Sequence, residues 1–257
     1  MKNYVALQDS RLTLESAGER ITVELYSRAG FELLTNLWIK AAAEHRLMYE
    51  PTWLGRPVIQ FPTDIVAMQE LLWQIKPDVV IETGVAHGGS LVLSASILQL
   101  IGKGKVVGVD IEIRPHNRSA IEAHPLKHRI ELIEGSSVAA ETVAMVRKAA
   151  AGAHTVVVFL DSNHTEAHVL KELELYAPLV TPGSYLVAHD GAQAWVWDIP
   201  RGKPEWKDDH PLNAIHKFLP AHPEFRIDPH WTRHGITSSP DGFLKKLTAA
   251  EMAGGAA

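Results

Sequence analysis

Hydrophobic and polar residues alternate along the chain in two rhythms. Short runs such as 79–82, 105–110 and 155–160 are almost wholly apolar, which is the pattern of strands buried on both faces of a sheet. Between them lie longer segments whose apolar residues recur every three or four positions, as in amphipathic helices. Strands and helices therefore alternate, which predicts an α/β fold with a mostly parallel sheet.

The predicted elements follow this rhythm from residue 64 to residue 190, and prolines or glycines punctuate them. The helices are predicted at 65–75, 90–100, 139–150 and 165–176, and the strands at 79–82, 105–110, 129–133, 155–160 and 184–188. After residue 192 the periodicity is weak, and we expect one helix over 212–219 and final strands near Phe225 and Phe243.

The first 60 residues have a different pattern. Phe31, Leu34, Trp38 and Ile39 recur at helical spacing, and three prolines then interrupt residues 51–62. We therefore expect residues 1–60 to form a helical cap and strap, and residues 61–257 to form the main domain with an aromatic-rich C-terminal region.

Composition excludes several classes of function. The chain has 25 Lys and Arg against 30 Asp and Glu, a net charge of −5 and no basic stripe, which argues against a nucleic-acid partner. It contains no Cys, so thiolate nucleophiles, disulfides and Cys-based zinc sites are excluded. No apolar run is long enough to span a membrane, and charges stand where a signal peptide needs an apolar stretch. We expect a cytoplasmic protein with no membrane partner.

Chemistry is expected where the parallel strands end, because such sheets bind ligands outside the carboxyl ends of their strands. The residues predicted at these ends are Glu82, Asp110, Gly135, Asp161, His189 and Asp190.

The loop from Glu82 to Ser90 follows a strand and opens a helix. Its glycines are spaced G-x-x-x-G-G rather than G-x-G-x-x-G, so it is not the dinucleotide fingerprint. A carboxylate at this strand end suits a cationic ligand rich in hydroxyls better than a diphosphate. S-adenosylmethionine has an ammonium, a sulfonium and a ribose diol, and Asp110 would accept hydrogen bonds from the ribose. The alternative is an ordinary tight turn with glycines for packing.

Here the sequence resembles a known group. E-x-G-x-x-x-G-x-S followed by V-x-V-D is similar to motifs I and II of class I S-adenosylmethionine-dependent methyltransferases, which have a Rossmann-like core. The resemblance is closer to the cephalosporin hydroxylase/rhamnosyl O-methyltransferase family and covers residues 50–191. The stretches that carry it are GRPVIQFPTD (55–64), PDVVIETGVAHGGS (77–90), VVGVDI (106–111), IEGSS (133–137), FLDSNHT (159–165) and YAPLVTPGSYLVAHD (176–190).

The resemblance implies S-adenosylmethionine, a divalent metal ion and a homo-oligomer. It also places Ser136 and Ser137, at the end of the third strand, near the adenine. The expected cofactor-binding residues are Glu82, Gly84, His87, Ser90, Asp110, Ser136 and Ser137. For His87 a contact with the cofactor and a purely structural place in the turn are equally open.

A second group of residues follows two neighbouring buried strands. Asp161 ends one, and His189 and Asp190 end the next. These three would hold a divalent cation, as in the similar metal-dependent catechol O-methyltransferases, and the cation would lower the pKa of an acceptor hydroxyl. Magnesium is the expected metal, but the third ligand in those enzymes is usually a carboxylate or an amide. If His189 is a ligand, its imidazole favours Mn²⁺, Fe²⁺ or Zn²⁺ over Mg²⁺. The alternative is that His189 does not bind the metal and lies behind the residues that do.

His164 lies three residues after Asp161, the offset of a base in the metal-dependent methyltransferases. A neutral imidazole takes a proton from a polarised hydroxyl near pH 7, so His164 is the predicted general base, with Asp161 as its catalytic partner. The alternative is that Asp161 and Asn163 cap the next helix. His168, one turn further on, is predicted to be a surface or interface residue.

Aromatic residues of the tail could stack on an acceptor, and Trp195 and Trp197 lie nearest to Asp190 in sequence. The predicted function is metal-dependent O-methylation of a small acceptor, a natural product such as a glycosylated or antibiotic-type compound with a sugar hydroxyl. One alternative is an iron-dependent hydroxylase with a two-His-one-carboxylate site from His164, His189 and one aspartate. Another is a cofactor-binding subunit without catalysis.

Overall fold

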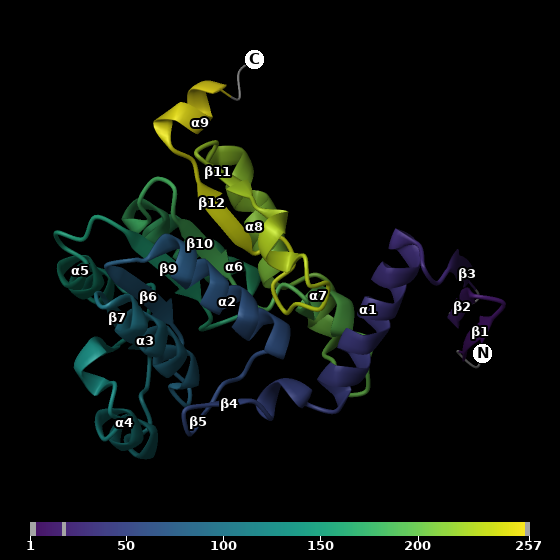
Figure 1. Ribbon diagram of the computed structural model, residues 1–257, viewed down its shortest axis with the longest axis horizontal. Helices are drawn as coiled ribbons and strands as arrows, with labels where there is room; N and C mark the ends of the chain where they lie inside the picture. Colours follow the sequence, from purple (N-terminus) through teal and green to yellow (C-terminus); the bar gives the residue numbers. More distant parts are fainter. Residues whose placement is uncertain (1–3, 17–18, 255–257) are drawn as a thin grey trace.

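The computed structural model describes residues 4–16 and 19–254. Its centre is a seven-stranded sheet (Figure 1). In spatial order the strands are β11 (Phe225–Ile227), β12 (Phe243–Lys246), β10 (Tyr185–Ala188), β9 (Val156–Leu160), β6 (Val79–Thr83), β7 (Lys105–Asp110) and β8 (Ile130–Glu134). The five strands from β10 to β8 pair in parallel, and β12 pairs antiparallel with both β10 and β11. The predicted α/β fold with a mostly parallel sheet is confirmed.

Helices cover both faces of this sheet because neighbouring strand residues point to opposite sides. Val80 and Phe159 pack with α2 (Pro62–Ile75) and α3 (Gly89–Ile101). Ile81 and Val158 pack on the other face. That face is covered by α5 (Ala140–Ala149), α6 (Glu166–Tyr176) and α8 (Pro211–Phe218). The two cores fix the carboxyl ends of the strands on one edge of the molecule.

The N-terminal part differs from the predicted helical cap. Residues 4–24 form an antiparallel sheet of β1 (Tyr4–Gln8), β2 (Arg11–Ser16) and β3 (Glu19–Glu24). Only then does the predicted helix follow, as α1 (Arg28–Glu44). Part of the sheet could have been predicted, because apolar and polar residues alternate with period two over residues 11–15 and 20–24. The turn between β1 and β2 places Asp9 and Ser10 at positive φ, as hairpin turns of type I′ require.

The strap over residues 51–62 is extended, as predicted, and contains the short hairpin of β4 (Thr52–Trp53) and β5 (Arg56–Pro57). The remaining helices are short. They are α4 (Pro115–Glu122), α7 (Gln193–Val196), α9 (Ala249–Gly254) and the 3₁₀ turns η1 (Leu47–Tyr49), η2 (Lys127–Arg129), η3 (Ala177–Leu179), η4 (Pro204–Lys207), η5 (Leu219–Ala221) and η6 (Pro229–Thr232). Among the residues the structure describes, no helix has the length and apolar character needed to cross a membrane.

A buried carboxylate joins the start of α2 to the loop before β12. Asp64 is 2% exposed and accepts hydrogen bonds from Thr237 Oγ1 at 2.6 Å and from Ser238 N at 2.8 Å. Burial raises the pKa of Asp64 to about 6 despite these bonds. The contact fixes Ser238 beside the carboxyl end of β10, where the cavities described next begin.

Candidate active site

Three adjoining cavities lie at the carboxyl ends of β6, β7, β9 and β10. The large cavity has a volume of about 340 Å³, the middle cavity about 210 Å³ and the small cavity about 190 Å³. Met48, Tyr49, His164 and Asp190 line both the large and the middle cavity. Gly84 and Ser162 line both the middle and the small cavity. The three cavities therefore adjoin one another in a row.

The turn after β6 forms the floor of the middle cavity, and its glycine is required. Gly84 has φ +92°, and a Cβ there would stand 1.9 Å from the backbone oxygen of Asp161. The turn is also tied to β7, because Asp110 Oδ2 accepts hydrogen bonds from the backbone N–H groups of Val85 (2.8 Å) and Ala86 (3.2 Å). Gly84 thus lets the ends of β6 and β9 approach each other closely.

Glu82 lies behind this turn instead of at the surface of a cavity. Its side chain is 1% exposed, and Oε1 accepts a short hydrogen bond from the hydroxyl of Ser90. Oε2 has no hydrogen-bond partner in the described part of the protein. Burial raises the pKa of Glu82 to about 8. Ser90 lines the middle cavity, so its hydroxyl connects the buried Glu82 carboxyl to the surface of that cavity.

The small cavity brings together four of the predicted cofactor residues, Gly84, Asp110, Ser136 and Ser137. His87 lines the middle cavity. His168, predicted to be a surface or interface residue, is partly exposed, and it also lines the small cavity, where its Nε2 lies 3.1 Å from Ser137 Oγ.

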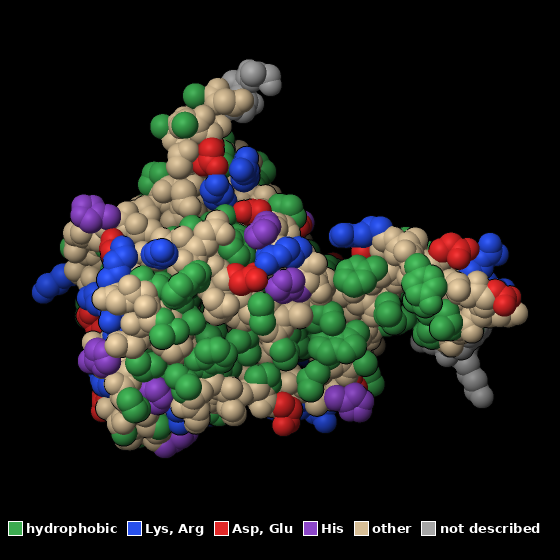
Figure 2. Space-filling model, viewed as in Figure 1, with side chains coloured by type: hydrophobic (Ala, Val, Ile, Leu, Met, Phe, Trp, Pro, Cys, Tyr) green, Lys and Arg blue, Asp and Glu red, His purple; other side chains and the backbone are tan. Residues whose placement is uncertain are grey.

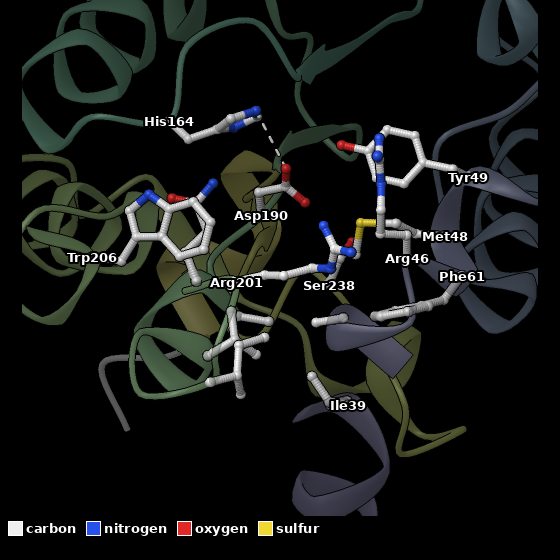
Figure 3. Close-up of a pocket in the computed structure, with 15 residues that line it drawn as sticks. Ile39, Arg46, Met48, Tyr49, Phe61, His164, Asp190, Arg201, Trp206 and Ser238 are labelled. Carbon is white, nitrogen blue, oxygen red and sulfur yellow. Dashed lines mark ion pairs between the residues drawn. The ribbon is translucent and has the colours of Figure 1, made fainter. Parts of the chain in front are cut away.

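Asp161, His164 and Asp190 form the cluster best suited to hold a metal ion. One potential ligand atom from each lies within 4.8 Å of those from the other two. His164 Nε2 is 3.3 Å from Asp190 Oδ2, which is the contact drawn in Figure 3. Two carboxylates and one imidazole are a suitable donor set for a divalent cation with open positions.

The electrostatic environment of Asp161 is strongly negative. Burial, followed by the nearby carboxylates of Asp190 and Glu82, raises the pKa of Asp161 well above its usual value. The side chain of Glu172, which is fully buried in α6, adds to this effect. No Lys or Arg is among the described residues that line the middle cavity. A cation bound there would compensate the charge.

His189 is not part of the metal cluster, contrary to the prediction that it is a ligand. It is 2% exposed, and its Nδ1 lies 2.9 Å from Ser239 Oγ and 3.5 Å from Gln60 Nε2. Burial lowers the pKa of His189 to about 4, so the ring is neutral near pH 7. Asp190 instead has φ +59°, a left-handed conformation that changes the direction of the chain directly after His189. With His189 outside, the cluster contains a single His and does not match a two-His-one-carboxylate site.

The large cavity lies between the N-terminal cap and the C-terminal region (Figure 3). Ile39 and Ala43 of α1 and Met48 and Tyr49 of η1 form one wall. The segment from α1 to η1 therefore covers this cavity.

The tryptophan on the large cavity is Trp206, and neither Trp195 nor Trp197 lines it. Trp195 lines a separate cavity beside α1, and Trp197 is 37% exposed. Sequence reasoning also missed Gln60, Arg46 and Arg201. These come from loops without periodicity, although Gln60 lies within the GRPVIQFPTD stretch.

Comparison with known proteins agrees with this architecture. The family model described as rhamnosyl O-methyltransferase/CmcI matches residues 45–247. A Rhamnosyl O-methyltransferase of Mycobacterium tuberculosis (strain ATCC 25618 / H37Rv) is 30% identical over 200 residues, which are 75% of this chain and 77% of the relative. One of Mycobacterium leprae (strain TN) is 34% identical over 143 residues, which are 54% of this chain and 59% of the relative.

Solved structures share the fold. A CmcI structure described with Mg and SAM has a TM-score of 0.57 at 18% identity and covers 78% of each chain. The SAH-bound Podospora anserina methyltransferase PaMTH1 has a TM-score of 0.53 at 14% identity, covering 85% of this chain and 88% of its own. At these identities the likeness concerns the fold alone, which is that of a class I methyltransferase.

Proposed function

The chain belongs to the rhamnosyl O-methyltransferase/CmcI family, and from this membership we propose that it is an S-adenosylmethionine-dependent O-methyltransferase that uses a divalent metal ion. The observation that carries the proposal is the group of carboxylates around the middle cavity, which no Lys or Arg of its described lining neutralises. Such a cavity favours a cationic methyl donor and a metal cation.

The donor would lie along the small and middle cavities. Asp110, Ser136 and Ser137 line the small cavity, where the ribose and the adenine would bind. Ser90 donates its hydroxyl proton to Glu82, so its oxygen stays free to accept a hydrogen bond from the donor's ammonium. Bound there, S-adenosylmethionine supplies a methyl group on a positively charged sulfur. Binding of the positively charged donor would favour ionisation of Glu82, because burial raises the pKa of this carboxyl to about 8 and a nearby cation lowers it.

Asp161 and Asp190 would hold the metal ion, since both carboxylates belong to the cluster of possible ligands. Bound there, a divalent cation lowers the pKa of an acceptor hydroxyl and fixes its position. The Gln60 side chain partly offsets the raised pKa of Asp161 and lies 3.5 Å from His189 Nδ1. We assign to Gln60 and His189 the role of holding Asp161 in position.

His164 would act as the general base. It lines both the large and the middle cavity, which is where an acceptor hydroxyl meets the donor. Asp190 lies 3.3 Å from its Nε2 and stabilises the imidazolium that forms when His164 takes the proton.

The acceptor would occupy the large cavity. Relatives are named for a rhamnosyl acceptor, and the cavity lies within the usual range of about 300–1,000 Å³ for small-molecule sites. A sugar hydroxyl of a glycosylated natural product is the acceptor group that these observations favour.

The role of Asp161 is tested by replacing it with Asn. The assay measures S-adenosylhomocysteine release with methyl α-L-rhamnopyranoside as the acceptor and Mg²⁺ or Mn²⁺ as the metal. The rate of methyl transfer should fall by at least ~100-fold, because even replacing a residue that only supports a metal ligand lowers activity by about 10–100-fold. Asp241→Asn is the control, since Asp241 is an exposed partner of His216 outside the three cavities. Full activity of Asp161→Asn, or activity in excess chelator, would contradict the metal mechanism. Oxygen consumption with Fe²⁺ would favour the hydroxylase, and cofactor binding without turnover would favour the non-catalytic subunit.

The role of His164 is tested by His164→Gln. The rate should fall by about 10²–10⁴-fold, because the amide cannot accept the proton. Binding of Mn²⁺, measured by calorimetry, should change little. A large loss of Mn²⁺ affinity would show that His164 is a metal ligand instead.

A further inference from the structure

We propose that the acceptor carries a carboxylate, which Arg46 and Arg201 bind at the side of the large cavity opposite its hydroxyl-activating end. The inference rests on the proposed function, since it names the class of acceptor that the same cavity takes. Both arginines line the large cavity, and neither lines the middle or the small one.

The two arginines approach the cavity from different parts of the chain. Arg46 lies between α1 and η1, and Arg201 lies between α7 and η4. Figure 3 shows the Arg201 guanidinium extending toward the space beside Ser238 and Met48, and Arg46 standing beside the ring of Tyr49. In this view Asp190 lies between His164 and the two guanidinium groups, and His164 lies furthest from Arg46 and Arg201. The cavity therefore has an acidic wall and a basic wall.

The balance of charge at the basic wall favours a singly charged anion. Arg46 makes no ion pair within the described residues, and its guanidinium carbon lies 4.6 Å from the ring centre of Tyr49. Arg201 is partly neutralised by Glu44, whose Oε1 lies 3.7 Å from Arg201 Nε. Two cations and one carboxylate leave one positive charge, which matches a carboxylate better than a doubly charged phosphate. The planar guanidinium also matches the two oxygens of a carboxylate.

Between the two charged walls the cavity is apolar. Ile39, Phe61 and Val196 line its inner part, and Trp206 stands at the side of His164. An acceptor that fits has its hydroxyl near His164 and Asp190, a ring or short apolar skeleton in the middle, and its carboxylate at Arg46 and Arg201.

The test compares an acid with its neutral isostere. The probes are 3,4-dihydroxybenzoate and 3,4-dihydroxybenzamide, which share a vicinal diol and differ in charge. Each is titrated by calorimetry into the full-length protein saturated with S-adenosylhomocysteine and Mg²⁺. The acid should bind at least about tenfold more tightly than the amide, the size expected of charge-assisted hydrogen bonds.

Variants then assign the preference to the two arginines. Arg46→Gln and Arg201→Gln should each weaken binding of the acid by about tenfold and leave binding of the amide unchanged. Arg46→Lys should restore part of the loss, since it keeps the charge without the planar fork. Lys203→Gln is the matched control, because this lysine lies over the Trp206 ring at 5.6 Å but does not line the cavity.

Equal affinity for acid and amide, failure of the acid to bind, or an equal loss for both probes in the arginine variants would overturn the proposal. Binding of S-adenosylhomocysteine is measured first for every variant. Its absence in the wild-type protein would contradict the proposed function itself, so the two failures are distinguishable.

Discussion

Glu82 shows how one buried side chain can link pH, stability and ligand binding. The carboxyl is enclosed, and one of its oxygens has no hydrogen-bond partner among residues 4–16 and 19–254. Its folded-state pKa of about 8 lies above the unfolded value of 4.5, so folding favours the protonated form. The stability that this proton contributes is complete below pH 4.5 and is lost as the pH rises through 8.

The prediction concerns Glu82→Gln, which removes the titration and keeps the shape. Between pH 6 and pH 8 the wild-type protein should lose about 2 kcal/mol of unfolding free energy relative to the variant, as follows from the two pKa values. Urea denaturation at both pH values measures the difference. A constant difference between the two proteins across this range would contradict the assigned pKa.

Part of the site could be predicted at the residue scale. Gly84, Asp110 and Asp161 follow apolar strands directly, so the sheet fixes their place at its carboxyl edge. His189 failed as a predicted ligand because neighbouring residues at a strand end point in different directions, and only Asp190 turns into the cavity. The place of Arg46 and Arg201 at the large cavity could not be predicted, because they lie in loops that are far apart in sequence.

Among the elements, the turn from β6 into α3 is the most constrained. Gly84 allows the turn to pass within contact of the β9 end at Asp161. The predicted strands and helices of the core agree with the structure to within three residues, and the largest difference is the start of α2 at Pro62. Their apolar runs and helical periodicity made them recognisable. The sheet of β1–β3 was not predicted. The helical spacing of the apolar residues from Phe31 to Ile39 was extended to all of residues 1–60.

Gly84→Ala tests this constraint. The added Cβ would meet the backbone oxygen of Asp161 and also force an unfavourable φ, so the variant should lose about 3 kcal/mol or more of stability and bind no S-adenosylhomocysteine. Gly102→Ala is the matched control, because Gly102 has a similar φ of +87° with no atom within 4 Å. It should lose only about 1 kcal/mol. Denaturation measures the stability of each variant, and calorimetry measures its binding of S-adenosylhomocysteine. Similar losses in the two variants would show that the close approach of Gly84 to Asp161 is not what requires a glycine.

At the scale of the whole molecule, the N-terminal sheet stands apart from the catalytic edge. Figure 1 shows β1–β3 at the far end of α1, and Figure 2 shows hydrophobic side chains exposed on this projection. Val5, Leu7, Ile21 and Tyr26 are all about half exposed or more. None of the residues of β1–β3 lines any of the three cavities.

Deleting residues 1–26 should therefore leave the cavities intact. Ser27, which caps α1 by accepting a hydrogen bond from Gly30 N, is retained. Affinity for S-adenosylhomocysteine should stay within about twofold, and the thermal midpoint should shift by less than about 4 °C, the effect of roughly 1 kcal/mol in a chain of this size. Calorimetry and a thermal melt check this. Loss of cofactor binding would show that the projection supports the site.

The most direct test of the central claim is a calorimetric titration of Mn²⁺ into the protein saturated with S-adenosylhomocysteine. The wild-type protein and Asp241→Asn should each bind one ion, and Asp161→Asn should lose that binding while it keeps the cofactor product. Undiminished Mn²⁺ binding by Asp161→Asn, or no binding by the wild-type protein, would contradict the assignment of these carboxylates as a cation site.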